Sequence, residues 1–84
     1  MAWVYILRGS SGRYYIGSTD NLERRLSEHQ RGSNHTTRRL GQTLKLVVTL
    51  RLPTMKEARA LEVTLKRKKN PKLAIALIRR IEAA

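Results

Sequence analysis

The stretch Tyr14–His29, "YYIGSTDNLERRLSEH", joins a strand pattern to a helix start through a glycine. Its first part, Tyr14–Ser18, is rich in aromatic and β-branched residues, which is typical of a strand. Asp20 is a suitable helix N-cap, and Glu23 stands at the third position after it, as in a capping box. Two leucines four positions apart then supply a buried helical stripe. The stretch therefore predicts a strand followed closely by an amphipathic helix.

A second strand pattern precedes this stretch and predicts a hairpin. Trp3–Leu7, "WVYIL", is aromatic and β-branched, and Gly9–Gly12, "GSSG", is a turn signal. If the loop is odd in length and centred on Ser10, Tyr5 lies directly opposite Tyr15, and the two side chains share one face of the sheet. A register shift of one residue would put them on opposite faces.

The second half of the chain predicts one strand and two helices. Leu44–Leu52, "LKLVVTLRL", reads as a strand that ends at a proline. Thr54, with a glutamate three positions later, predicts a capped helix that runs to about Lys69. Asn70-Pro71 ends that helix and starts another, because proline is favoured at a first helical position. The expected apolar faces of these two helices consist of Ala58, Leu61 and Leu65, and of Leu73, Ala74, Leu77, Ile78 and Ile81.

Between these halves lies a polar and basic segment. Gly32 is a natural stop for the first helix, and Ser33–Thr43 forms either a loop or a short helical turn. The order is then strand, strand, helix, optional short helix, strand, helix, helix. A chain of 84 residues with no internal repeat or linker is expected to form a single domain over residues 1–84.

Charge is the strongest global feature of the sequence. Lys and Arg number 18 against 6 Asp and Glu, which gives a formal net charge of +12. The pI of about 11.4 is typical of a protein that binds nucleic acid, although an anionic membrane surface or an acidic protein would attract the same charge. A solvated face would explain some of this excess, but its size favours a polyanionic partner. The basic residues cluster at Arg24-Arg25, Arg38-Arg39, Arg79-Arg80 and Lys66–Lys69.

Three absences restrict the class of protein. The sequence has no cysteine, which excludes disulfides and thiolate metal sites. No apolar stretch approaches the ~20 residues that a helix needs to span a bilayer, so we expect no membrane association of that kind. The N-terminus lacks the charged and then apolar pattern of a signal peptide. These features together predict a cytoplasmic protein.

Glu62 is a candidate functional residue on its helical position alone. It falls between Ala58 and Leu65, at the border of the apolar stripe. A carboxylate there loses hydration unless it gains a partner. One interpretation is an ordinary ion pair with Lys66, four residues on, worth about 0.2–0.5 kcal/mol. The other is a carboxylate that binds a hard divalent cation through oxygen.

Four further residues are ambiguous singly and informative together. Tyr5 and Tyr15 are consistent with ordinary cross-strand aromatics, and Arg25 with a solvent residue beside Arg24. His29 lies near a helix C-terminus, where the helix dipole favours its charged form. Arg25 and His29 are four residues apart and so share a helix face. Phosphodiester cleavage needs a proton acceptor, a cation for the developing charge and a metal ion, and this set with Glu62 could supply all three.

The order of these residues resembles a known family. Val4-Tyr5-Ile6, then Tyr15-Ile16-Gly17, then "NLERR" and finally Glu62 are similar to the motifs of the GIY-YIG nuclease superfamily. Size and order resemble its small bacterial members and the N-terminal nuclease module of the excision-repair protein UvrC. Ser18 stands where some members have lysine.

The resemblance implies an α+β fold, with a three-stranded antiparallel sheet flanked by helices. It also implies metal-dependent endonuclease activity on nucleic-acid phosphodiester bonds. In this interpretation Tyr5 and Tyr15 are the motif tyrosines, one of which helps to activate water. Arg25 stabilises the phosphate, His29 matches a histidine near the first motif tyrosine, and Glu62 holds one Mg²⁺ or Mn²⁺.

The resemblance also implies which residues and partners take part in substrate binding. Gly17 is expected to act as a turn glycine that lets the strand end lie close to the substrate. The expected substrate is nucleic acid, with DNA favoured over RNA, and a protein partner is a possible source of specificity. The alternative is a non-catalytic nucleic-acid-binding module with the same fold. The residues expected to contact nucleic acid outside the catalytic set are Arg24, Arg38, Arg39 and Lys66.

Overall fold

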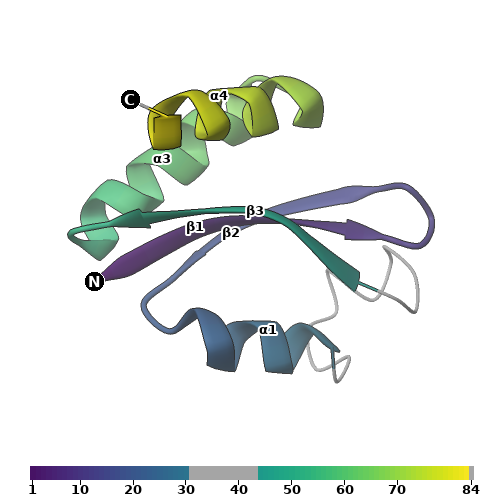
Figure 1. Cartoon of the computed structure of the whole chain (residues 1–84), viewed down its shortest axis with the longest axis horizontal. Coiled ribbons are helices and arrows are strands. Elements are labelled where there is room, and N and C mark those ends of the chain that lie inside the picture. Colours follow the sequence, from purple (N-terminus) through teal and green to yellow (C-terminus); the bar gives the residue numbers. More distant parts are fainter. Residues whose placement is uncertain (31–43, 84) are drawn as a thin grey trace.

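The fold is built on a three-stranded antiparallel sheet, as expected for the α+β class (Figure 1). The structure is a computed structural model that describes residues 1–30 and 44–83. Strands β1 (Ala2–Gly9), β2 (Tyr14–Thr19) and β3 (Leu44–Leu52) are arranged in the order β2-β1-β3. The first strand is therefore central, and β2 is one edge of the sheet. The predicted bounds of β3 are confirmed.

The register of the β1–β2 hairpin differs from the predicted one. Tyr5 pairs with Gly17, and Tyr15 pairs with Leu7. The prediction that Tyr5 faces Tyr15, which assumed a loop centred on Ser10, is therefore wrong. The pairing partner of Tyr5 has moved by two residues along β2. Because side chains alternate with a period of two, the two tyrosines still lie on one face, as diagonal neighbours.

Backbone conformation in the loop explains this register. Gly12 has a φ of 88°, in the left-handed region that glycine adopts readily. Its N–H donates to the carbonyl of Gly9 at 2.9 Å, and the N–H of Gly9 donates to the carbonyl of Arg13 at 2.9 Å. These bonds close the chain around Ser11, one residue later than the sequence analysis assumed.

The helices cover both faces of the sheet (Figure 1). Helix α1 (Leu22–Gln30) lies on one face, and α3 (Met55–Arg67) and α4 (Pro71–Ala83) lie on the other. Tyr5 and Leu7 of β1 are also buried. The main apolar core fills the space between the sheet and the helices α3 and α4, and consists of Ala2, Val4, Ile6, Val48, Leu50, Ala58, Leu65, Ala74 and Ile78.

Helix α1 begins one residue later than predicted. The side-chain oxygen of Asn21, not that of Asp20, accepts the backbone N–H of Arg24 at 3.0 Å. The hydroxyl oxygen of Thr19 accepts the N–H of Asn21 at 3.1 Å, which fixes Asn21 at the cap position. Asp20 is left at the surface, with its carboxylate 3.9 Å from Arg24 Nη2. The predicted Asp20 cap is therefore wrong.

The starts of the other two helices are confirmed. Thr54 Oγ1 accepts the N–H of Glu57 at 3.2 Å at the start of α3. Asn70 Oδ1 accepts the N–H of Lys72 at 3.0 Å at the start of α4. Helix α3 ends at Arg67, slightly before the predicted end.

The apolar face of α4 is rotated relative to the predicted one. Ala74 and Ile78 are buried and Leu77 packs against the core, as predicted, whereas Leu73 and Ile81 are exposed and Ile75, which was not predicted, packs against the core. The helix packs mainly against β3, and this contact sets which side of the helix is covered.

Some predictions fall outside the described residues, namely the Gly32 stop, the optional helical turn within 33–43, and the contacts of Arg38 and Arg39. Within residues 1–30 and 44–83, the helices are too short or too polar to cross a membrane.

Candidate active site

Tyr5 extends from the central strand toward the edge strand, where Gly17 makes room for it. The side chain is 1% exposed. A Cβ atom placed on Gly17 would lie 2.5 Å from the Tyr5 hydroxyl oxygen and 2.6 Å from Cζ. Gly17 lies inside β2 and not in a turn, so the predicted turn role is wrong. Its lack of a side chain serves to admit the phenol of Tyr5.

Tyr5, Tyr15 and His29 form one aromatic cluster. The Tyr5 hydroxyl and His29 Nε2 are hydrogen-bonded at 2.8 Å. The rings of Tyr15 and His29 meet edge to face, with centroids 5.1 Å apart, and those of Tyr5 and Tyr15 are 6.3 Å apart. His29 is 2% exposed even though it lies in the last turn of α1. Residues from two strands and one helix therefore converge here.

The cluster favours uncharged forms of its titratable groups. Burial lowers the pKa of His29, and the positive charge of Arg25 lowers it further, against an opposing effect of Glu28. Burial raises the pKa of Tyr5, and the neighbouring Tyr15 raises it further. The helix dipole therefore does not decide the charge of His29, because desolvation acts in the opposite direction. At neutral pH the cluster contains a neutral imidazole and a protonated phenol.

Arg25 faces this cluster, while Arg24 lies at the surface. The Arg25 guanidinium affects the pKa of both Tyr5 and His29. Its Nη1 lies 3.5 Å from a Glu28 carboxylate oxygen, and its Nε is buried with no hydrogen-bond partner among the described residues. The side chain of Arg24 is 60% exposed and lies 3.6 Å from Glu28. Arg25 thus shares a side of α1 with His29, as the spacing predicted.

Glu62 reaches the edge strand from the opposite face of the sheet. The Ser18 hydroxyl donates a hydrogen bond to Glu62 Oε1, and Lys66 Nζ lies 2.6 Å from Glu62 Oε2. The carboxylate side chain is 19% exposed, and its charge also raises the pKa of Tyr5. The ion pair with Lys66 that the sequence allowed is therefore formed. Lys66, which the sequence predicts to contact nucleic acid, is 52% exposed and pairs with the candidate metal ligand; its contact with nucleic acid stays a prediction.

The donor set at Glu62 fits a hard cation that keeps most of its water. No group of three or more His, Asp or Glu side chains gathers within the described ranges. Mg²⁺ commonly uses one or two carboxylates and completes its shell with water and substrate phosphate. The Lys66 ammonium already forms an ion pair with one oxygen of the Glu62 carboxylate. Glu62 could therefore hold a divalent ion if the ammonium moved away.

The edge strand β2 connects the two parts of the candidate site. Its odd-numbered residues Tyr15 and Gly17 face the Tyr5–His29 pair. Its even-numbered residue Ser18 faces Glu62.

One protein-family model matches most of the chain. Residues 1–74 match the model of the GIY-YIG catalytic domain. The chain belongs to the GIY-YIG family. The matched range contains both tyrosine motifs, the arginine of α1 and Glu62, so it includes every part of the candidate site.

Several proteins similar to this chain carry the name UPF0213. One from Streptococcus pneumoniae serotype 4 is 37% identical over 70 residues, which cover 83% of this chain and 71% of the relative. One from Orgyia pseudotsugata multicapsid polyhedrosis virus is 36% identical over 77 residues, covering 90% and 74%. The solution NMR structure of a UPF0213 protein from Bacillus halodurans shares 31% identity with a TM-score of 0.53, covering 89% of this chain and 85% of that one.

Two features of this GIY-YIG domain were missed by the sequence analysis. Ser18 was noted only as a departure from lysine, yet it holds Glu62 against β2. Glu28 was not singled out, yet it lies beside both arginines of α1. Strand alternation would have placed Ser18 opposite Gly17, and the i,i+3 and i,i+4 spacing would have found Glu28.

Proposed function

We propose that this GIY-YIG domain is a metal-dependent endonuclease that hydrolyses phosphodiester bonds in nucleic acid. The observation that carries the proposal is the buried Tyr5–His29 hydrogen bond beside the Arg25 guanidinium. A buried polar cluster of this kind, with shifted pKa values, is typical of functional sites. The formal charge of +12 supplies the attraction for a polyanionic substrate.

Each chemical requirement of the reaction has a candidate residue. Neutral His29 is a proton acceptor, and the Tyr5 hydroxyl is hydrogen-bonded to it. Arg25 stabilises the charge that develops on the phosphate. Tyr15 is only half-buried, so its phenol is the one that we assign to contact water or phosphate. Glu62 and Ser18 would hold one Mg²⁺ or Mn²⁺, which would polarise the phosphate oxygen.

The proposed substrate is DNA in preference to RNA, cleaved with structural selectivity or weak sequence specificity. Family membership and charge support nucleic acid. We propose that substrate shape or a protein partner supplies specificity.

A cleavage assay on matched nucleic acids tests the proposal. Branched, duplex and single-stranded DNA and RNA are incubated with the wild-type protein and Mg²⁺ or Mn²⁺. Tyr15→Phe, Arg25→Ala and Glu62→Gln should each abolish or strongly reduce cleavage while thermal denaturation shows a folded protein. Absence of cleavage by wild type on every substrate would overturn the nuclease proposal.

The second candidate function is a non-catalytic nucleic-acid-binding module. It is favoured by the two partners of the Glu62 carboxylate, Ser18 and Lys66, which satisfy both oxygens without a metal. Both functions predict salt-dependent binding, with a log–log slope of about −0.9 per duplex phosphate contacted. Titration at several salt concentrations measures this slope, and a flat dependence would contradict both. Binding without cleavage would favour the module.

A further inference from the structure

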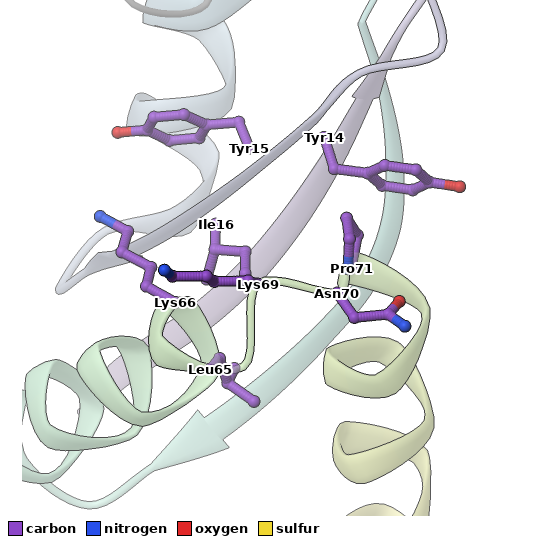
Figure 2. A pocket seen from close by; sticks show the side chains of 8 residues that line it. All are labelled: Tyr14, Tyr15, Ile16, Leu65, Lys66, Lys69, Asn70 and Pro71. Atoms are coloured by element: carbon purple, nitrogen blue, oxygen red, sulfur yellow. The ribbon is translucent and has the colours of Figure 1, made fainter.

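A pocket of about 370 Å³ lies beside the candidate active site (Figure 2). This volume is at the low end of the range ~300–1,000 Å³ that is typical of small-molecule sites. The pocket lies between the edge strand β2 and the turn that joins α3 to α4. Its lining combines apolar and cationic side chains, including Tyr14, Ile16, Leu65, Lys66, Lys69 and Pro71.

The apolar part of the lining suits a flat ring. Ile16 is packed against the main core, and Leu65 belongs to it, so both have fixed positions. The Tyr14 ring is held by the Arg8 guanidinium, whose carbon lies 5.8 Å from the ring centroid. In Figure 2 the ring stands close to Pro71 at the start of α4. These side chains present apolar surfaces against which an aromatic base can pack.

The cationic part of the lining suits a phosphate. Figure 2 shows Lys66 and Lys69 extending in the same direction past Ile16, toward the side on which the Tyr15 hydroxyl lies. Both ammonium groups add positive potential on this side of the pocket, which attracts a phosphate. Lys66 pairs with Glu62 at 2.6 Å, so the pocket is continuous with the candidate metal ligand.

The backbone at Lys69 supports a ligand-directed role for its side chain. Lys69 has a φ of 53°, in the left-handed region, and it follows the C-cap residue Lys68 of α3. Glycine is the usual residue at this position, because a side chain is unfavourable there. Lysine is not favoured by the backbone conformation at this position. Its side chain, however, lines the pocket.

We infer that this pocket binds one unpaired nucleotide next to the bond that the proposed nuclease cleaves. The base would pack against Ile16, Leu65 and the Tyr14 ring, and its phosphate would lie between Lys66 and Lys69. A base paired inside a duplex is stacked between its neighbours and cannot reach such a pocket, so the occupant is an unpaired base. The inference rests on the proposed nucleic-acid function and specifies its substrate class as DNA with unpaired nucleotides, such as flaps, junctions or single strands.

The test compares two short single strands that carry the same phosphates. One is an oligothymidylate, and the other is the same backbone without bases. Fluorescence anisotropy at fixed salt and without divalent metal measures their affinities, so that no cleavage is needed. Wild type should bind the strand with bases about 5- to 150-fold more tightly, the range that base stacking on an aromatic side chain gives. Equal affinities would overturn the inference.

Three variants and a control locate the effect. Tyr14→Ala should remove the preference for bases, while Tyr14→Phe should retain it and so controls for loss of folding. Lys69→Gln should weaken both strands equally, and by more than Arg79→Gln, which removes the same charge from the exposed surface of α4. The inference fails if Tyr14→Ala keeps the preference or if the two charge variants have equal effects.

The outcomes separate this inference from the proposed nuclease. A preference for bases, lost in Tyr14→Ala, would support the pocket even in a protein that never cleaves. Cleavage by a wild-type protein that shows no preference for bases would overturn the pocket and leave the nuclease intact.

Discussion

Substituting Gly17 tests how the candidate site is held together. A Cβ atom at this position would lie 2.5 Å from the Tyr5 hydroxyl oxygen, 2.6 Å from its Cζ and 3.0 Å from Tyr15 Cε1. The only described glycine with a positive φ is Gly12. The backbone of Gly17 therefore tolerates alanine, and the cost of Gly17→Ala comes from contact with the phenol.

The magnitude follows from the burial of Tyr5. The ring is 1% exposed, so it cannot move aside without disturbing its neighbours. Overpacking of this kind costs about 1–3 kcal/mol, and losing the hydrogen bond to His29 adds roughly 0.5–1.5 kcal/mol. Together these effects should lower the free energy of unfolding of Gly17→Ala by about 3 kcal/mol. For a domain of this size that corresponds to a decrease of about 12–24 °C in the melting temperature.

Thermal and urea denaturation, followed by circular dichroism, measure this loss in two backgrounds. In Tyr5→Leu the phenol is absent, so the cost of Gly17→Ala should fall by about 1 kcal/mol or more, a coupling typical of residues in contact. Gly12→Ala is the control. Its φ is 88° and no atom lies within 4 Å of the added Cβ, so its cost of ~1 kcal/mol is a backbone effect and should be the same in both backgrounds. An unchanged stability for Gly17→Ala, or an equal loss in both backgrounds, would refute the reasoning.

Three further predictions concern charge. Glu62→Gln should abolish Mg²⁺-dependent cleavage and leave nucleic-acid affinity unchanged or slightly improved, since a negative charge near phosphate is removed; a wild-type rate at saturating Mg²⁺ in a gel assay would contradict the metal role. Arg25→Ala should reduce cleavage far more than Arg24→Ala, because only Arg25 affects the pKa of the Tyr5–His29 pair; equal losses in parallel rate measurements would count against this. The pKa of His29 is lower in the folded protein than in the unfolded chain. Between these two pKa values the unfolded chain therefore binds more protons. The contribution of neutral His29 to the free energy of unfolding is fully present above about pH 6.5 and is lost as the pH falls through the folded pKa. Urea denaturation across this range should show a flatter pH dependence for His29→Gln, and an identical dependence would exclude His29 as its source.

Local patterns in the sequence were sufficient to predict most elements of the fold. The strand Leu44–Leu52 and the Thr54 cap are confirmed because β-branched runs and capping side chains act within a few residues. The cap of α1 was misplaced because Asp20 and Asn21 are adjacent and are both good caps. The choice depends on Thr19, whose hydroxyl oxygen accepts the N–H of Asn21.

The geometry of the candidate site depends on distant residues, and this limited its prediction. The spacing of Arg25 and His29 predicted a shared helix face, but not that this face would lie over Tyr5 and bury His29. The pairing of Glu62 with Lys66 is a local i,i+4 contact, whereas its bond with Ser18 joins residues that only the tertiary fold brings together. The hairpin register was wrong because a loop with a glycine at each end is compatible with two centres.

The register of the β1–β2 hairpin decides which side chains of β2 face each half of the candidate site. Along β2, Tyr15 and Gly17 face the Tyr5–His29 pair, while Ile16 and Ser18 face α3. The two faces of one edge strand therefore present the phenols on one side and the hydroxyl that positions Glu62 on the other. A slip of one residue would exchange the two sets of side chains, because strand side chains alternate. It would place Ile16 or Ser18 opposite Tyr5, and Gly17 or Thr19 at the position from which Ser18 contacts Glu62. It would also put a side chain where the Tyr5 ring needs a glycine. The length of the short loop around Ser11 thus fixes both halves of the candidate site at once.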